Sequence, residues 1–392
     1  VTLCEKGIIG GEQSGRNWGW CRNTLRDPKE IPLMQQSARD WQDKKVFGNL
    51  ETGYRTTGIV YFSGRNHGDT EHFLNWLSAI QDFELDSRMI TAKEVDQLIP
   101  GGTDLPSEGA LFTPSDGCAE PSQAASVIST AAMDAGVKIF ENTAVRGLER
   151  HAGQVRGVVT EKGVIGCNAV ILAGGAWSRL FAGNEGVNLP ALNVMGSAMR
   201  TLPLPNGPDI SVAGKRFGWR KRADGGYLVS QADATIFDIV PDSFRLAWAF
   251  RPILLQGLRQ LRLRFGTAFF HELTRGRKWA LDETTPFELE RIANPAPAQA
   301  VLEEAAQRLK QAFPIFDQMQ IADRWGGLID VTPDALPLIG TSASVPGLTF
   351  ATGFSGHGFG LGPGGGRLAA EIVMGGDICV DPSPFTPARF GL

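Results

Sequence analysis

The chain of 392 residues is long enough for two domains with a substantial core, and 42% of it is hydrophobic while 20% is charged. This composition is typical of a soluble globular protein, and the net charge of -4 argues against a nucleic-acid-binding protein. Five scattered cysteines and five histidines without ligand spacing indicate neither a disulfide framework nor a metal site.

The chain begins with VTLCEKG, which predicts a short strand that ends at Glu5. An acid at such a strand end is typical of the second strand of a dinucleotide-binding βαβ unit, where it binds a ribose; a plain surface glutamate is the alternative. The first strand and its GxGxxG loop are missing, and without them the sheet would keep two open edges. We therefore expect a strand–GxGxxG–helix of about 30 residues before Val1.

The next stretch, GEQSGRNWGWCR over 11–22, mixes glycines and polar groups with two tryptophans. Such a segment could wrap a pyrophosphate and pack on a ring system, or form an aromatic loop core held by a salt bridge. The chain pattern then predicts strands and helices at the following places: a strand over 56–64, a helix over 69–83, a helix from the capping box at 91–94 to Pro100, and a helix over 122–135 that Gly136 ends.

The second half of the chain contains two glycine-rich strand ends. Strands over 137–140 and 144–150 and a hairpin turning near 161–163 lead to AVILAGGAWS (169–178), which predicts a strand covered on both faces. Residues 189–316 are less regular, until a helix over 298–313 that Pro314 ends. Strands over 324–340 and 347–354 precede ATGFSGHGFGLGPGGG (351–366), in which eight glycines of sixteen lead into a final helix over 362–376. The N-terminus of that helix can stabilise negative charge, as on a reduced flavin.

Taken together, these motifs resemble the D-amino-acid oxidase superfamily of FAD oxidoreductases, and within it the bacterial flavin-dependent L-amino-acid oxidases and deaminases. The resemblance rests on VTLCEKGIIGGEQSGR, GVKIFENTAVRGLE, VILAGGAWSRLFAGNEGVNLPALNV, WALDETTPFE, RWGGLIDVTPDALPLIG and DPSPFTPARF. It implies an α/β (α+β) fold in which a Rossmann-like FAD-binding domain of the GR2 type carries an inserted antiparallel-sheet substrate domain. The FAD domain would comprise 1–52, 122–188 and 326–392, and the substrate domain 53–121 and 189–325.

The resemblance also implies the residues that hold FAD. Glu5 and Lys6 would bind the adenosine ribose, and Val145 the adenine through its backbone. The other expected contacts are Gln13, Ser14, Gly15, Arg16, Asn17, Ala173, Gly174, Trp177, Asp330, Gly353, Gly356, His357, Gly358, Phe359 and Gly360. Some relatives attach the flavin to a cysteine near the TPD turn, but DVTPDALPLIG contains none, so non-covalent FAD is expected.

The implied reaction is oxidative deamination of an L-amino acid to a 2-keto acid and ammonia, with hydride transfer from Cα to the flavin and O2 as acceptor, giving hydrogen peroxide. An α-carboxylate favours a bidentate arginine, for which Arg55 beside Tyr54 is the first choice and Arg22 and Arg220 are alternatives. A structural role for Arg55 is the competing interpretation. Membrane-attached deaminases carry an arginine after a tyrosine-bearing strand, but GGYLVSQADATIF has none.

An apolar side-chain site could involve Trp325 and the segment 248–250, although such aromatics are more often plain core. Two other functions stay open: a D-amino-acid or secondary-amine oxidase or dehydrogenase of the same fold, and a flavin-free, non-catalytic subunit. The arginine-containing apolar stretch 254–270 is expected to form a lid or an oligomer contact, as in a homodimer, rather than a membrane contact. With no signal peptide or spanning segment in the visible chain, a cytoplasmic protein is expected.

Overall fold

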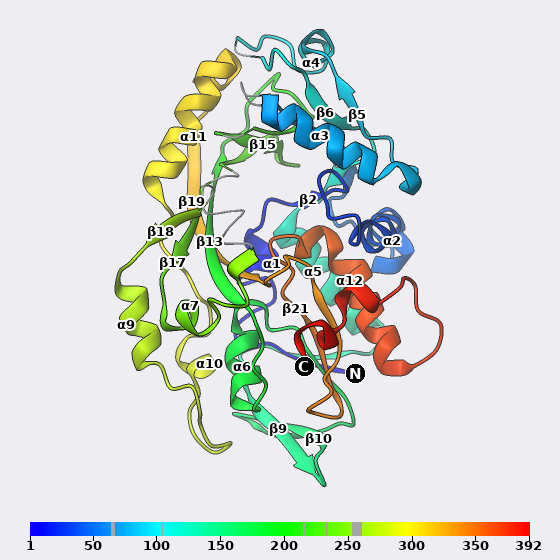
Figure 1. Ribbon diagram of the computed structural model, residues 1–392, viewed down its shortest axis with the longest axis vertical. Coiled ribbons are helices and arrows are strands. Elements are labelled where there is room, and N and C mark those ends of the chain that lie inside the picture. Colours follow the sequence, from blue (N-terminus) through cyan, green and yellow to red (C-terminus); the bar gives the residue numbers. More distant parts are fainter. Residues whose placement is uncertain (64–66, 104, 215, 232–233, 253–260) are drawn as a thin grey trace.

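A ten-stranded, mostly antiparallel sheet forms the largest part of the protein (Figure 1). The computed structural model describes all residues except 64–66, 104, 215, 232–233 and 253–260. In spatial order the strands are β18 (Leu261–Arg264), β17 (Thr235–Asp238), β13 (Leu192–Thr201), β16 (Tyr227–Ser230), β15 (Gly218–Lys221), β14 (Ser211–Ala213), β4 (Ile59–Phe62), β6 (Ala110–Thr113) and β5 (Arg88–Ile90), and β19 (Ile321–Val331) also pairs with β13.

The longest pairing in this sheet joins β13 to β19, whose sequence positions are far apart. The two strands are antiparallel from Leu192↔Val331 to Thr201↔Ile321. Gly196 stands opposite Gly327 in this register, so neither strand carries a side chain at that point. β19 also spans the boundary expected between residues 325 and 326.

Helix α11 (Gln299–Ala312) covers one face of the large sheet (Figure 1). Its buried stripe Val301, Leu302, Ala305 and Leu309 follows the helical period, as the sequence predicts. Trp219 of β15 packs edge-on against Phe313, with ring centroids 4.9 Å apart. This packing anchors the sheet that borders the cavity described below.

Two smaller parallel pairings carry the predicted nucleotide-binding strands. β1 (Thr2–Cys4) pairs with β8 (Lys138–Phe140), and β12 (Val170–Leu172) pairs with β21 (Leu348–Thr352), which continues to β20 (Leu338–Thr341). The two sheets are not joined to each other among the described residues. The prediction that β12 is covered on both faces is wrong, because Ile171 is 41% exposed. That a further strand lies between the two sheets stays a prediction.

A three-stranded meander and a second small sheet complete the strand inventory. β9 (Val145–His151), β10 (Gln154–Thr160) and β11 (Gly163–Gly166) are antiparallel, and the pair Thr160↔Gly163 confirms the predicted turn. β2 (Trp20–Cys21) and β3 (Arg55–Thr56) both pair with β7 (Gly117–Cys118). This sheet holds the tryptophan-rich segment in place.

Helix α12 (Gly358–Met374) packs closely against α2 (Ile31–Gln42), as Figure 1 shows. The Ser37 hydroxyl and the Trp41 indole N–H both donate to the Gly360 carbonyl, at 2.6 and 2.9 Å. A Cβ on Gly364 would lie 2.9 Å from the Leu33 carbonyl oxygen, so only glycine fits there. The helix therefore starts four residues earlier than predicted, because part of the glycine-rich stretch serves helix packing.

The remaining helices mostly follow the expected pattern. Thr91 and Glu94 form the predicted capping box of α4. Of the apolar stretch 254–270, residues 254–260 lie outside the described residues, and the rest forms β18 and the start of α9. The other helices are α1 (Gln13–Arg16), α3 (His67–Ala79), α4 (Ala92–Leu98), α5 (Pro121–Asp134), α6 (Ser178–Asn184), α7 (Pro241–Arg245), α9 (Thr267–Thr274) and α10 (Pro286–Leu289). In the part of the chain that the structure covers, none of the helices has the length and apolar character needed to cross a membrane.

Candidate active site

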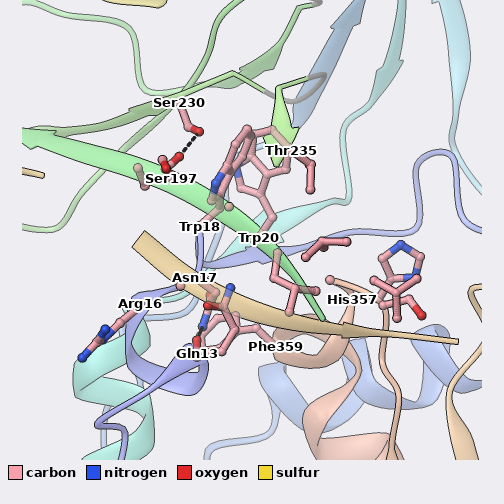
Figure 2. A pocket seen from close by; sticks show the side chains of 18 of the residues that line it. Gln13, Arg16, Asn17, Trp18, Trp20, Ser197, Ser230, Thr235, His357 and Phe359 are labelled. Atoms are coloured by element: carbon pink, nitrogen blue, oxygen red, sulfur yellow. Dashed lines mark hydrogen bonds between the residues drawn. The ribbon is translucent and has the colours of Figure 1, made fainter. Parts of the chain in front are cut away.

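A cavity of about 530 Å3 is bordered by the β13–β19 pair and the start of helix α12. Most of its lining comes from four parts of the chain: the segment from α1 to β2 with the residues after it, strands β13 and β19, residues between 230 and 250, and residues 355–360. Tyr61 of β4 and Val301 of α11 also contribute. Figure 2 shows Arg16 and His357 at opposite sides of this space, with Trp18 and Trp20 next to each other between them. The two tryptophan rings meet edge to face, 4.7 Å apart.

The glycine loop and the first residues of α12 form one wall. Gly356, His357, Phe359 and Gly360 line the cavity, whereas the predicted contacts Asp330, Gly353 and Gly358 do not. Helix α12 has no side-chain cap and no acid in its first turn. Its first N–H groups thus remain available to an anionic or electron-rich group.

The buried Asp330 shapes this wall from behind. Its Oδ2 accepts hydrogen bonds from the Gly353 N–H at 2.5 Å and from the Thr352 hydroxyl at 3.0 Å. Burial raises the pKa of the Asp330 carboxyl, while these two bonds act in the opposite direction. The bonds tie the end of β21 to β19, and so position the loop that follows, in which Gly353 has φ +67° and Gly356 φ +85°.

Helix α1 and the tryptophans form the opposite wall. Gln13, Arg16 and Asn17 line the cavity, while Ser14 and Gly15 lie outside the lining. Gln13 Oε1 is buried without a hydrogen-bond partner among the described residues. The same oxygen lies 2.1 Å from where a Cβ on Gly327 would be, so Gln13 reaches the sheet only because residue 327 is glycine.

The residues predicted to bind the adenosine half of FAD gather elsewhere, near the ends of β1 and β12. Glu5 accepts a hydrogen bond from the Gly7 N–H at 2.7 Å, and burial raises the pKa of its carboxyl. Trp177 donates its indole N–H to Glu12, whereas Ala173 and Gly174 connect β12 to the short 3-10 helix Gly175–Trp177. Val145 begins β9. None of these residues lines the cavity.

The Lys6 side chain is bonded to other parts of the protein. Its ammonium donates to Glu12 at 2.6 Å and to the carbonyls of Glu290 and Arg291 at 3.1 and 2.8 Å. An ammonium has three N–H donors, and all three are used here. The Lys6 ammonium therefore holds the segment around residue 290, and ribose binding by Lys6 stays a prediction for its backbone N–H.

Arg55 and Tyr54, the first-choice substrate residues, lie outside the cavity lining. Arg55 donates to the Lys221 carbonyl at 3.0 Å, and Tyr54 stacks on Trp41. These contacts place both residues in the packing between β3 and neighbouring elements, because β3 pairs with β7 rather than facing the cavity. Assigning the substrate carboxylate to Arg55 is therefore not supported by the geometry.

The two alternative arginines differ in role. Arg220 is fully buried, pairs with Glu120 at 2.7 Å and donates to the Trp18 carbonyl at 2.6 Å, so it supports the cavity wall from outside. Arg22 lines the cavity, with its guanidinium carbon 5.3 Å from the centre of the Tyr61 ring. Its Nη1 donates to the Thr24 carbonyl.

A second arginine at the same end, Arg26, was missed by sequence reasoning. It lines the cavity together with Arg22, Tyr61 and His357, although only 3% of its surface is exposed. Its spacing of four residues from Arg22 is no signal for a shared face, because residues 22–26 form a loop rather than a helix. His357 Nδ1 lies 3.0 and 3.1 Å from the two carboxylate oxygens of the fully buried Glu30. Burial and the nearby Arg26 cation lower the pKa of His357 to about 4, so its imidazole is neutral at pH 7.

The rest of the lining is mainly apolar. Trp325, as predicted for a side-chain site, lines the cavity and donates its indole N–H to the Arg16 carbonyl at 2.7 Å. Phe250 also contributes, but Trp248 is 81% exposed and lies elsewhere. No aspartate or glutamate is among the described residues that line the cavity. The other apolar wall residues are Leu192, Val194, Ala198, Ala234, Phe237, Val301, Ile329 and Val331.

Comparison with known proteins identifies the family. Residues 1–372 match the model of the DAO family, described as FAD dependent oxidoreductase. The chain belongs to this family. The DAO fold is also that of two solved structures: L-amino acid deaminase from Proteus myxofaciens in complex with anthranilate (TM-score 0.94, 34% identity, 100% of this chain and 88% of that one) and L-amino acid deaminase from Proteus vulgaris (TM-score 0.93, 30% identity, 100% and 91%). Among curated proteins, sarcosine oxidase subunit beta of Rhodobacter capsulatus is 25% identical over 398 residues, covering 100% of this chain and 81% of that protein.

DAO-family proteins bind FAD, and the residues present here fit the flavin. The bare backbone at Gly327 lets the Gln13 side chain lie against the sheet, and Gln13 Oε1 is there a buried acceptor for a ring N–H. The N–H groups at the start of α12 suit the electron-rich edge of a reduced flavin. Gln13, Asn17, Trp18, Gly356, His357 and Phe359 would hold the ring system. Among the described residues, no cluster of His, Cys, Asp and Glu is arranged to bind a metal ion.

Proposed function

We propose that this DAO-family protein oxidises L-amino acids to 2-keto acids and ammonia within the cavity, with O2 as acceptor and hydrogen peroxide as second product. The observation that carries the proposal is a cavity that combines a flavin-fitting wall with the guanidinium of Arg22 and, among the described lining residues, no acidic side chain. The chemistry that bound FAD supplies is acceptance of a hydride from the substrate Cα. The resulting imino acid hydrolyses to the keto acid and ammonia.

Arg22 is the residue that would hold the substrate carboxylate. A guanidinium offers parallel N–H donors that match a carboxylate, and the aromatic rings of Trp20 and Tyr61, at 6.0 and 5.3 Å, limit its movement. The neutral imidazole of His357 adds no charge that would repel the substrate ammonium. Binding the carboxylate at this end would orient Cα toward the flavin-fitting wall.

The apolar part of the cavity suggests the preferred side chain. Phe237, Phe250 and Trp325 offer apolar and aromatic surface, and none of the lining residues that the structure describes has a carboxylate that could pair with a cationic side chain. We therefore propose that neutral amino acids with large apolar or aromatic side chains are better substrates than lysine or arginine. The likeness to two L-amino acid deaminases, at 34% and 30% identity, supports the L-amino-acid assignment.

Oxidation of a secondary amine is the second candidate, since a sarcosine oxidase subunit beta aligns with the entire chain at 25% identity. A substrate such as sarcosine also presents a carboxylate and an amine, so Arg22 could serve it equally. Its products would be glycine and formaldehyde instead of a keto acid and ammonia. This second candidate predicts a partner subunit, which size-exclusion chromatography of the protein from its native source would reveal.

The test is a substrate panel with the purified protein. The visible spectrum first establishes whether flavin is bound, since a colourless protein would favour a non-catalytic subunit. L- and D-amino acids and sarcosine are then supplied, and keto acid, ammonia, formaldehyde and peroxide are measured. We expect L-leucine or L-phenylalanine to give keto acid, with Arg22→Gln raising KM at least ten-fold and Arg22→Lys less. Turnover of D-amino acids or sarcosine alone would overturn the proposal. Reduction of an added dye without formation of peroxide would show that O2 is not the electron acceptor.

A further inference from the structure

Arg26 carries a buried positive charge that forms no direct ion pair within the described structure, although Glu30 and Asp116 act on it from a longer distance. Its side chain lines the cavity although the residue is only 3% exposed. Nη1 is buried without a hydrogen-bond partner, and Nε donates to the Arg22 carbonyl at a long 3.4 Å. Among the described residues Arg26 forms no ion pair. An unpaired buried cation is costly, so a protein rarely keeps one without a use.

The two nearest acidic groups are engaged with other partners. Glu30 faces Nδ1 of His357 at 3.0 and 3.1 Å. Asp116 accepts hydrogen bonds from the backbone N–H groups of Asn23 and Thr24 and from the Thr24 hydroxyl, at 2.7, 3.1 and 2.5 Å. Burial, followed by repulsion from Arg22, lowers the pKa of Arg26 to about 9, so these acids do not offset the loss of water. The guanidinium still carries its charge at pH 7.

The position of Arg26 indicates where an anion would bind in the cavity. Arg22 and Arg26 reach the cavity from one loop, with the Tyr61 ring beside them. The adjoining lining residues that the structure describes include aromatic and aliphatic side chains and no acidic one, so a ligand with an apolar body has favourable surface next to the two cations. A carboxylate can accept up to four hydrogen bonds and thus can use donors from both arginines.

We propose that Arg26 and Arg22 together form a carboxylate-binding site, in which Arg26 supplies the buried contact that makes binding selective for a charged carboxylate. The inference deepens the proposed function, and it rests on that function only for the identity of the natural ligand. The ligand class is an organic monocarboxylate with an apolar or aromatic body. Removing Arg26 should weaken such ligands without weakening the fold, because the side chain makes few bonds to the protein.

Equilibrium binding of benzoate and of its neutral isostere benzamide tests the proposal without any turnover. Both are titrated by isothermal calorimetry into the purified protein with its bound FAD. We expect saturable benzoate binding and at least ten-fold weaker benzamide binding. In Arg26→Gln, benzoate affinity should fall at least ten-fold, to the level of benzamide, while Arg26→Lys keeps part of the preference. The matched control is Arg308→Gln, an exposed arginine of α11 bonded to Gln311, which should bind benzoate as the parent does.

Melting temperatures separate binding from a structural role. Arg26→Met removes the unpaired charge but keeps most of the length, and we expect an equal or higher melting temperature together with lost benzoate selectivity. A lowered melting temperature with unchanged benzoate affinity would overturn the proposal, as would equal affinity for benzoate and benzamide in the parent. If no amino acid is oxidised but benzoate binding depends on Arg26, the proposed function fails and the carboxylate site stands. If amino acids are oxidised and Arg26→Gln binds benzoate normally, only the Arg26 inference fails.

Discussion

Glu30 and His357 are 327 residues apart in the chain and form a hydrogen-bonded pair at the cationic end of the cavity. The pair joins the start of α2 to the residue that precedes α12. Glu30 is fully buried, and 23% of the His357 side chain is exposed. The Glu30 carboxylate bonds Nδ1 of His357 and thereby fixes the orientation of the imidazole ring. The other ring nitrogen, Nε2, is therefore held in a defined position as well.

This pair predicts how stability depends on pH. His357 has its pKa lowered to about 4 from an ordinary 6.5, because burial and Arg26 disfavour the charged imidazole. Between these values the unfolded chain binds more protons, so the free energy of unfolding should rise as pH increases from about 4 to 6.5. The rise from this group alone is at most about 3 kcal/mol. Urea unfolding of the parent and of His357→Gln at pH 4.5 to 7.5 measures it.

The His357→Gln protein should show a shallower increase over this range than the parent, and the two slopes should agree above pH 7. NMR titration of the imidazole signals gives an independent reading, since the signal lost in His357→Gln is the one that titrates lowest. Identical slopes in both proteins, or a His357 pKa near 6.5, would contradict the prediction.

The buried pair Arg220–Glu120 should contribute strongly to stability, because it fixes the tryptophan segment. Arg220 donates to Glu120 at 2.7 Å and to the Trp18 carbonyl at 2.6 Å, and Glu120 also accepts from the Ala223 N–H at 2.9 Å. Arg220→Met leaves the Glu120 carboxylate buried without its cation, which should lower the free energy of unfolding by about 3 to 5 kcal/mol. Urea unfolding followed by tryptophan fluorescence measures the loss.

The exposed pair Arg88–Glu94 is the matched control for that substitution. Its side chains are 53% and 39% exposed, and its ion-pair distance is 2.9 Å. Arg88→Met should lower the free energy of unfolding far less than Arg220→Met does, since water screens such exposed pairs. Similar decreases in the free energy of unfolding for the two variants would show that burial does not make the Arg220–Glu120 pair more important for stability.

Gly327→Ala should reduce flavin retention while the fold remains stable. A Cβ at this position would lie 2.1 Å from Gln13 Oε1, so the Gln13 side chain must turn away from its place in the cavity wall. Because the clash is with the end of a flexible side chain, the cost to folding is small. We expect a several-fold lower ratio of flavin to protein absorbance after gel filtration, with a melting temperature of the apoprotein close to that of the parent.

Gly362→Ala is the control for the alanine itself. Gly362 lies in α12 with no atom within 4 Å of the added Cβ. This variant should retain flavin fully and gain up to about 1 kcal/mol from the better helix propensity of alanine. Equal flavin content in both variants would contradict the prediction that flavin binding needs Gln13 in the place that the missing side chain of Gly327 leaves for it.

Local signals predicted the elements that depend on neighbouring residues. The capping box at Thr91, the turn at Thr160–Gly163 and the apolar stripe of α11 follow from contacts within a few residues. Strand β13 was not predicted, because it pairs with β19 more than 100 residues later and buries residues of both faces. Its burial pattern lacks the alternation that reveals a strand with one exposed face.

In the candidate site, too, residues within sequence motifs could be predicted, whereas residues that depend on contacts between distant segments could not. Gln13, Arg16, Asn17, Trp325 and part of the glycine-rich segment, all singled out from the sequence, line the cavity, and their roles toward FAD and substrate stay predictions. Sequence could not distinguish Arg22 and Arg26 from Arg55, because which arginine faces the cavity depends on how β2, β3 and β7 pair. Tertiary packing thus determines which of these arginines faces the cavity.

Arg55→Gln tests that choice against the hypothesis drawn from sequence alone. Arg55 donates to the Lys221 carbonyl and lies outside the cavity lining, so its loss should lower the free energy of unfolding by about 1 kcal/mol. The KM for the best amino acid should change less than two-fold, whereas Arg22→Gln raises it at least ten-fold. Steady-state kinetics and urea unfolding of both variants show which of the two arginines binds the substrate carboxylate. A large KM increase in Arg55→Gln at parental stability would return the carboxylate to Arg55 and remove Arg22 from that role.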